Sequence, residues 1–272
     1  MTPWAPGSAL LAAPSGDWVK SPLCIRGHPM TYCVAMSLEA GMIFASDSRT
    51  NAGVDQIARF SKMRVVANDG ERVIVTLSSG NLSITQNALN ALDQRARAGD
   101  DSPHLSNAES MFDVARLIGD ALREAKSRDG PYLMQSNIDS SASFLVGGQI
   151  RGEPPRLFNV YSEGNFIEAT ADTCYFQSGE TKYGKPIIDR VISRRSSLVD
   201  ATKCTMVSFD STMRSNISVG LPIDLVVYET DALTIGMQRR VDEDDSYYQM
   251  VHRQWGEGLR QVFTQLPDPD WK

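Results

Sequence analysis

The chain has 272 residues, 42% of them hydrophobic, which is enough to bury the core of one large domain or two small ones. Its 27 basic and 33 acidic residues give a net charge of −6, and this balance argues against binding of nucleic acid or of an anionic membrane. No apolar run approaches the roughly 20 residues that span a bilayer. The four cysteines lack C-x-x-C spacing, so we expect a cytoplasmic protein without a disulfide framework or a zinc site.

The first thirty residues differ in composition from the rest of the chain. They hold five of the thirteen prolines and show little hydrophobic periodicity, so they are not expected to pack as a regular element. We predict that 1–30 is a disordered extension, a propeptide or the product of a mis-assigned start. One compact domain is then expected over 31–272.

Beyond this extension, stretches rich in β-branched and aromatic residues alternate with segments whose apolar residues recur at helical spacing. Strands are predicted at 32–37, 42–46, 72–77, 143–146, 157–161, 166–169, 223–228 and 233–237. Helices are predicted at 82–97, 111–125, 183–192, 198–209 and 247–266. Turns are expected at 39–41, 147–148 and 163–164.

Pairs of strands thus alternate with pairs of helices. This order excludes a Rossmann arrangement, which needs single helices between parallel strands. It favours an α+β fold, a four-layer αββα sandwich of two antiparallel sheets between helix pairs. The extended final helix carries an apolar stripe that must be buried against something, formed by Tyr247, Val251, Trp255, Leu259 and Phe263.

Histidine is scarce, which limits the possible chemistry. The three histidines, His28, His104 and His252, have no neighbouring motif that recommends them as a catalytic base. The sequence contains no H-E-x-x-H and no G-x-S-x-G, and the glycines at 147–148 lack the rest of a phosphate loop. We therefore expect neither a metal nor a cofactor.

A threonine at a chain start can hydrolyse an amide without histidine, because its hydroxyl attacks while its own α-amine accepts the proton. The ordinary pKa of such an amine, about 7.7 to 8.0, suits a general base near neutral pH. A nearby ammonium lowers that pKa, and a carboxylate holds the ammonium in place. Met30-Thr31 offers such a start, since threonine is small enough for a preceding initiator methionine to be removed.

Four motifs in order resemble the catalytic β-subunits of proteasomes. They are Ala45-Ser-Asp47-Ser-Arg49-Thr50 followed by Gly53, Lys62 fifteen residues after Asp47, Ser78-Ser79-Gly80 leading to Thr85-Gln86, and Ser178-Gly179 ahead of Tyr183-Gly184. The M-T-Y-C of residues 30–33 and the S-D-S-R-T-N-A-G-V-D of residues 46–55 resemble more closely the bacterial Anbu branch, the ancestral β-subunit related to HslV. The resemblance implies the N-terminal-nucleophile hydrolase fold.

The resemblance also implies roles for five residues. Thr31 Oγ is the expected nucleophile, and the Thr31 amine is the expected base. Lys62 lowers their pKa values, and Asp47 orients Lys62. The Gly80 N–H binds the oxyanion, a contribution typically worth about 2.7 to 4 kcal/mol. Ser178 steadies the amine.

Two further positions resemble the D-x-x-S pair of the family, with departures. Ser215 lies five residues after Asp210 instead of three, and Asn216-Ile217 replaces the usual Gly-Gly. Arg49 is expected to be structural, and the thiol of Cys33, two residues beyond Thr31, is a minor alternative nucleophile.

These motifs predict a threonine-type peptidase with a peptide or amide substrate, and together with the apolar stripe of the final helix they predict a ring or helical homo-oligomer. The sequence leaves open whether an unidentified ATP-dependent partner takes part. One alternative is an amidase dedicated to a single small substrate, which would use the same residues. Another is a non-catalytic shell subunit, although such a subunit needs none of Thr31, Asp47 and Lys62.

Overall fold

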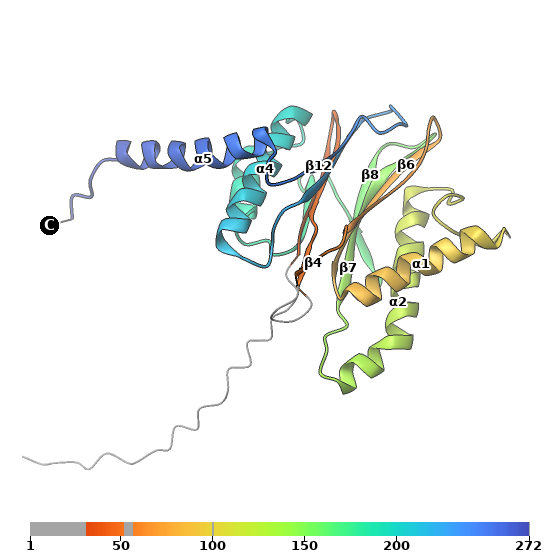
Figure 1. The fold of residues 1–272 in the computed structure, drawn as a ribbon. Helices are drawn as coiled ribbons and strands as arrows, with labels where there is room; N and C mark the ends of the chain where they lie inside the picture. The colour runs from red at the N-terminus through yellow and green to blue at the C-terminus, as the bar shows by residue number, and fades with distance from the viewer. Residues whose placement is uncertain (1–30, 52–56, 100, 272) are drawn as a thin grey trace, which may run out of the picture.

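The computed structural model describes residues 31–51, 57–99 and 101–271, and two antiparallel sheets lie face to face at its centre (Figure 1). The predicted extension over 1–30 lies outside the described residues, as does Gly53. Helices cover the outer faces of both sheets (Figure 1). The predicted four-layer αββα sandwich is therefore confirmed.

The first sheet has the strand order β10-β1-β2-β11-β12, with every pairing antiparallel. β1 and β2 form the predicted hairpin, and all their residues are buried because the sheet is covered on both faces. The strands are β1 (Tyr32–Leu38), β2 (Gly41–Asp47), β10 (Tyr175–Gly179), β11 (Ile223–Glu229) and β12 (Met237–Val241).

The second sheet has the sequential order β5-β6-β7-β8-β9, also antiparallel throughout. Its strands are β5 (Met63–Asn68), β6 (Arg72–Gly80), β7 (Ala142–Ile150), β8 (Arg156–Val160) and β9 (Phe166–Glu168). Two short strands, β3 (Arg49–Asn51) and β4 (Ile57–Arg59), lie between β2 and β5 in the chain and form a two-stranded ribbon.

Each sheet has its own helix pair. α1 (Leu82–Ala98) and α2 (Met111–Gln135) pack on the second sheet, and α3 (Lys185–Val191) and α4 (Leu198–Ser215) pack on the first. Asn81 begins α1 directly after β6, and its side chain accepts hydrogen bonds from the backbone N–H groups of Ser83 and Ile84. This cap fixes the place where β6 ends and the helix starts.

A third apolar cluster fills the space between the sheets, and Gly147 sets how closely they approach there. A Cβ at this position would lie 2.9 Å from a ring atom of Phe44 and 2.8 Å from the methyl group of Met42, both on the facing sheet. The predicted turn at 147–148 is therefore wrong, because both glycines lie inside β7. The turn at 163–164 is confirmed by Gly164, whose φ is +77°.

The strands that the sequence did not predict lie at sheet edges or in the small ribbon. β5 and β10 are edge strands, and their hydrophobic pattern is weak because they are only partly buried. β12 begins at Met237, where the predicted strand ends, because residues 231–233 turn with positive φ at Asp231 and Leu233. The Leu233 N–H donates to the Tyr228 hydroxyl at 3.2 Å and closes that turn.

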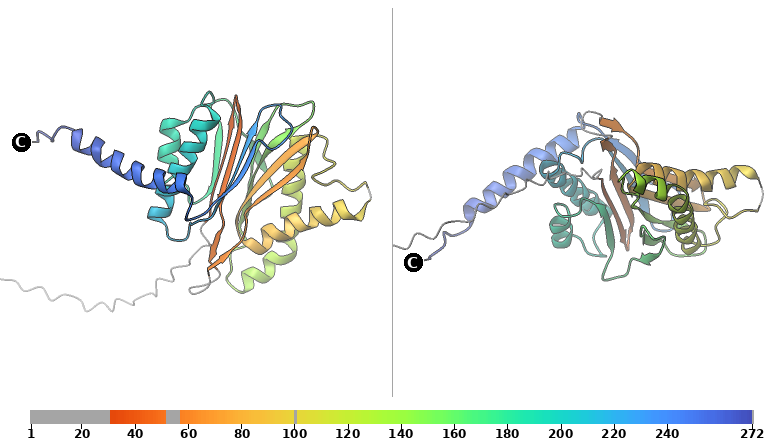
Figure 2. Two further views of the ribbon diagram at one scale, coloured as in Figure 1. Left: turned by 45° about the horizontal axis from the view of Figure 1, so that its top comes forward. Right: turned by 90° about the horizontal axis from the view of Figure 1, so that it is seen from below.

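The last helix, α5 (Ser246–Gln265), starts against α4 and then projects from the body (Figures 1 and 2). Of the predicted apolar stripe, Val251 is buried, whereas Leu259 and Phe263 are 52% and 76% exposed. The described residues thus cover this stripe only near the start of the helix. No described helix combines the length and apolar character needed to cross a membrane.

Candidate active site

Thr31 lies directly before β1 and is held by the end of β10. It is buried, and its carbonyl oxygen accepts a hydrogen bond of 2.7 Å from the Glu180 N–H. Gly179 pairs with Tyr32 and has φ of +86°, and a Cβ there would lie only 1.8 Å from the Thr31 oxygen. A glycine at 179 is thus required for β10 to approach Thr31.

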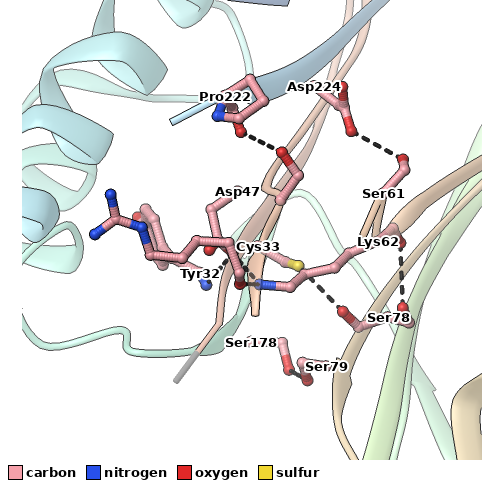
Figure 3. A network of polar contacts seen from close by, with 12 residues as sticks. Tyr32, Cys33, Asp47, Ser61, Lys62, Ser78, Ser79, Ser178, Pro222 and Asp224 are labelled. Carbon is pink, nitrogen blue, oxygen red and sulfur yellow. Dashed lines mark hydrogen bonds and ion pairs between the residues drawn. The ribbon is translucent and has the colours of Figure 1, made fainter. Parts of the chain in front are cut away.

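A buried ion pair lies beside the start of β1. The ammonium of Lys62 lies 2.7 Å from Asp47 Oδ1 (Figure 3). It also donates to the Arg49 carbonyl at 2.7 Å. The same Asp47 oxygen accepts the backbone N–H of Tyr32, the residue after Thr31, at 3.0 Å. Asp47 is 0% exposed and Lys62 is 7% exposed, so both charges are shielded from water.

The electrostatics of this pair follow from its burial. Burial raises the pKa of the Asp47 carboxyl, and the Lys62 ammonium and the N–H groups of Tyr32 and Gly220 oppose that rise. The pair places the positive charge of Lys62 beside the start of β1, the strand that Thr31 directly precedes. This is the arrangement that lowers the pKa of a neighbouring amine or hydroxyl.

Thr31 opens onto a cavity of about 320 Å³ between the two sheets. Gly80, at the end of β6, lines the same cavity, and its φ of +92° is accompanied by close approach to the Ser141 carbonyl, 2.3 Å from where a Cβ would lie. Ser178 lines the cavity from β10. The structure therefore brings Thr31, Gly80 and Ser178 together around one space.

Two serines that sequence reasoning assigned no role lie at this cavity. Ser79 and Ser143 are cross-strand partners on β6 and β7, and with Ser178 they form a cluster of three hydroxyls. The O···O distances are 2.8 Å for 79–143, 2.5 Å for 79–178 and 2.9 Å for 143–178 (Figure 3 shows Ser79 and Ser178). The sequence shows these serines at inward-facing strand positions, which was the available signal. It does not show that they meet, because they come from two different sheets.

Asp210 and Ser215 lie elsewhere. The Asp210 carboxylate is 2.5 Å from His252 Nδ1 and accepts the Tyr248 hydroxyl at 3.3 Å, so it contacts α5. Ser215 is exposed at the end of α4 and lines a different cavity together with Arg49. Neither residue lines the cavity that holds Thr31.

Arg49 and Cys33 have structural contacts near the site. The Arg49 guanidinium donates to the Ile217 carbonyl at 2.8 Å, which ties the ribbon to the loop after α4. Cys33 is fully buried, and burial raises the pKa of its thiol, which contacts the Ser78 carbonyl at 3.6 Å. Such a thiol is a poor nucleophile. Within the described ranges, no three metal-ligating side chains gather in one place.

Two antiparallel sheets between helix pairs, with a threonine at the entrance of the first strand beside a buried Asp–Lys pair, define the proteasome-like class of N-terminal-nucleophile hydrolases. Within that class, the chain is similar to solved structures of Anbu, the ancestral β-subunit. The protein from Yersinia bercovieri is 48% identical with a TM-score of 0.83, over 89% of this chain and 100% of that one.

Two further Anbu structures agree. The helical assembly of the Anbu complex from Pseudomonas aeruginosa has 48% identity and a TM-score of 0.83, over 88% of this chain and 98% of that one. Anbu from Hyphomicrobium sp. has 47% identity and a TM-score of 0.82, over 88% of this chain and 100% of that one. No family model and no curated protein matches the sequence. The chain belongs to the Anbu family.

Proposed function

We propose that this chain is a threonine-type peptidase in which Thr31 Oγ is the nucleophile and the free α-amine of Thr31 is the general base. The observation that carries the proposal is the burial of the Lys62–Asp47 pair beside the start of β1, directly after Thr31, which opens onto the cavity. Two buried charges cost free energy that a purely structural position would avoid.

The mechanism begins with attack of Thr31 Oγ on the substrate carbonyl carbon, while the amine takes the hydroxyl proton. The Gly80 N–H stabilises the oxyanion of the tetrahedral intermediate. Collapse breaks the amide bond, the ammonium returns the proton to the leaving amine, and an acyl ester on Thr31 remains. Water activated by the same amine hydrolyses that ester.

The proposal requires a free Thr31 amine, because an amide nitrogen within the chain is not basic. The active form is therefore one that lacks residues 1–30. Asp210 and Ser215 are not included in the catalytic set, since their contacts lie with α5 and with the loop after α4.

A homo-oligomer is the proposed state of assembly. The Anbu complex from Pseudomonas aeruginosa forms a helical assembly. In this chain the distal half of α5 exposes Leu259, Val262 and Phe263, which a second copy could cover.

The test is a chain that starts at Met30, with its N-terminus sequenced after purification. A peptidyl epoxyketone, which reacts with both the hydroxyl and the free amine of a terminal threonine, should add once to Thr31. Thr31→Ala should abolish labelling and lower peptide hydrolysis by at least about 100-fold, while Thr31→Ser should retain both in part. Hydrolysis that survives in Thr31→Ala would rule out the proposed nucleophile. Activity on small amides but not on peptides would instead favour the dedicated amidase.

A further inference from the structure

The serine ring, formed by the hydroxyls of Ser79, Ser143 and Ser178, has a hydrogen-bonding pattern fixed by the number of its protons. Each hydroxyl has one proton to donate and two lone pairs. The three oxygens lie within 2.5 to 2.9 Å of one another, so each pair needs a proton between its members. All three protons are consumed inside the ring, and each oxygen keeps one lone pair for an outside partner.

A closed ring of this kind offers acceptors and no donors to the cavity that it shares with Thr31. A substrate carbonyl or carboxylate would find no donor among the three serine hydroxyls, whereas an ammonium finds an acceptor. We propose that Ser79 and Ser143 are positioning residues that lock Ser178 as a hydrogen-bond acceptor for the Thr31 α-amino group. This inference rests on the proposed function, in which that group is the base.

The consequence for catalysis concerns the direction of the amine lone pair. When Ser178 accepts an N–H of the amine, the nitrogen lone pair remains available to the Thr31 hydroxyl. If Ser178 instead donates into that lone pair, the amine cannot act as a base. The ring excludes the second arrangement because the Ser178 proton is already engaged with a neighbouring serine.

The location of the ring supports this role. Ser178 comes from the first sheet, as Thr31 does, and it is the register partner of Cys33. Ser79 and Ser143 come from the second sheet, where they pair directly across strands. The second sheet thus controls the hydrogen-bonding direction of a residue on the first.

The charged groups near the amine are the same with or without the ring. Lys62 from the start of β5 is paired with Asp47 at the end of β2. Asp139 lines the cavity ahead of β7, and its carboxylate accepts hydrogen bonds from Ser141. Glu180 after β10 accepts from the Asn216 amide at 3.0 Å. A change confined to Ser143 therefore leaves these charges in place.

The perturbing variant is Ser143→Ala, measured in the chain that starts at Met30. Two hydroxyl protons then remain, and one of them suffices for the hydrogen bond between Ser79 and Ser178. The second proton can be donated to the lone pair of the amine, which favours the neutral form of the amine. We expect kcat to fall about three- to tenfold. We also expect the acidic limb of the kcat/KM profile to move to lower pH by about half a unit to one unit. Ser143→Thr, which keeps the hydroxyl on a strand position, should restore both values.

Ser208→Ala is the matched control. Its hydroxyl pairs with the buried Tyr32 hydroxyl at 2.6 Å, on the helix-facing side of β1. It should cost similar stability without moving the acidic limb. A pH profile of kcat/KM for Ser143→Ala that is identical to that of the wild type would overturn the proposed role of the ring. A loss of kcat without a shift of the acidic limb would overturn it too.

Epoxyketone labelling separates this failure from failure of the proposed function. If the wild type is labelled at Thr31 and its profile equals that of Ser143→Ala, only the role of the ring is lost. If the wild type is not labelled, the proposed nucleophile fails and the inference fails with it.

Discussion

Replacement of Lys62 by methionine tests whether the ion pair is as desolvated as its burial indicates. Methionine keeps most of the volume of the side chain but leaves Asp47, which is 0% exposed, without its counter-ion. Removing one partner of a buried pair typically costs about 3 to 5 kcal/mol of unfolding free energy. The same variant should lose hydrolysis, because no ammonium then lies beside the start of β1.

The sign of the pH dependence follows from Asp47. In Lys62→Met, burial raises the pKa of Asp47 without opposition from an ammonium, so its folded-state pKa lies above its unfolded value of about 3.9. Stability is then highest below that unfolded value and is lost as the pH rises through the folded pKa. The cost of Lys62→Met relative to the wild type should accordingly be smaller at low pH than at neutral pH.

Urea unfolding at several pH values and one protein concentration measures this cost. The double variant Lys62→Met with Asp47→Asn removes both charges, and it should recover most of the stability lost in the single variant while remaining inactive. A single variant that loses less than about 1 kcal/mol, with no dependence on pH, would refute the assignment of a desolvated pair. A double variant with restored hydrolysis would refute the proposed catalytic role of Lys62.

Two further substitutions probe the surroundings of Thr31. Gly179→Ala should displace Thr31 and abolish epoxyketone labelling, because the added methyl group would lie 1.8 Å from the Thr31 oxygen. Gly99→Ala is its control, since Gly99 also has positive φ, at +70°, but has nothing within 4 Å of the added atom; it should cost about 1 kcal/mol and leave labelling intact. Cys33→Ala should retain hydrolysis, and iodoacetamide should not inhibit the wild type at neutral pH, since burial raises the pKa of the Cys33 thiol and keeps it protonated. Inhibition by iodoacetamide that Cys33→Ala abolishes would contradict this expectation.

The central elements could be predicted from sequence because burial on both faces or on one helical stripe leaves a strong pattern. β1, β2 and α1 are of this kind. The edge strands β5 and β10 could not be predicted, since partial exposure dilutes their pattern.

The candidate site divides in the same way. Asp47 and Lys62 belong to one short stretch of chain that a local motif describes, and the structure joins them. The approach of Ser143 to Ser178 depends on how two sheets pack, which no local pattern encodes. For Asp210 the motif resemblance suggested a site residue, but it could not reveal that the carboxylate contacts α5.

The close contact between the sheets at Gly147 has a consequence for how this enzyme can be altered. Thr31 and Ser178 are attached to one sheet, whereas Gly80, Ser79 and Ser143 belong to the other. The distance between the sheets is therefore a parameter of the reaction. A larger residue at 147 would push on Phe44 and Met42 and so separate Thr31, the proposed nucleophile, from Gly80, the proposed oxyanion site, although it touches neither. A change in core packing that is too small to unfold the protein should therefore still lower its activity.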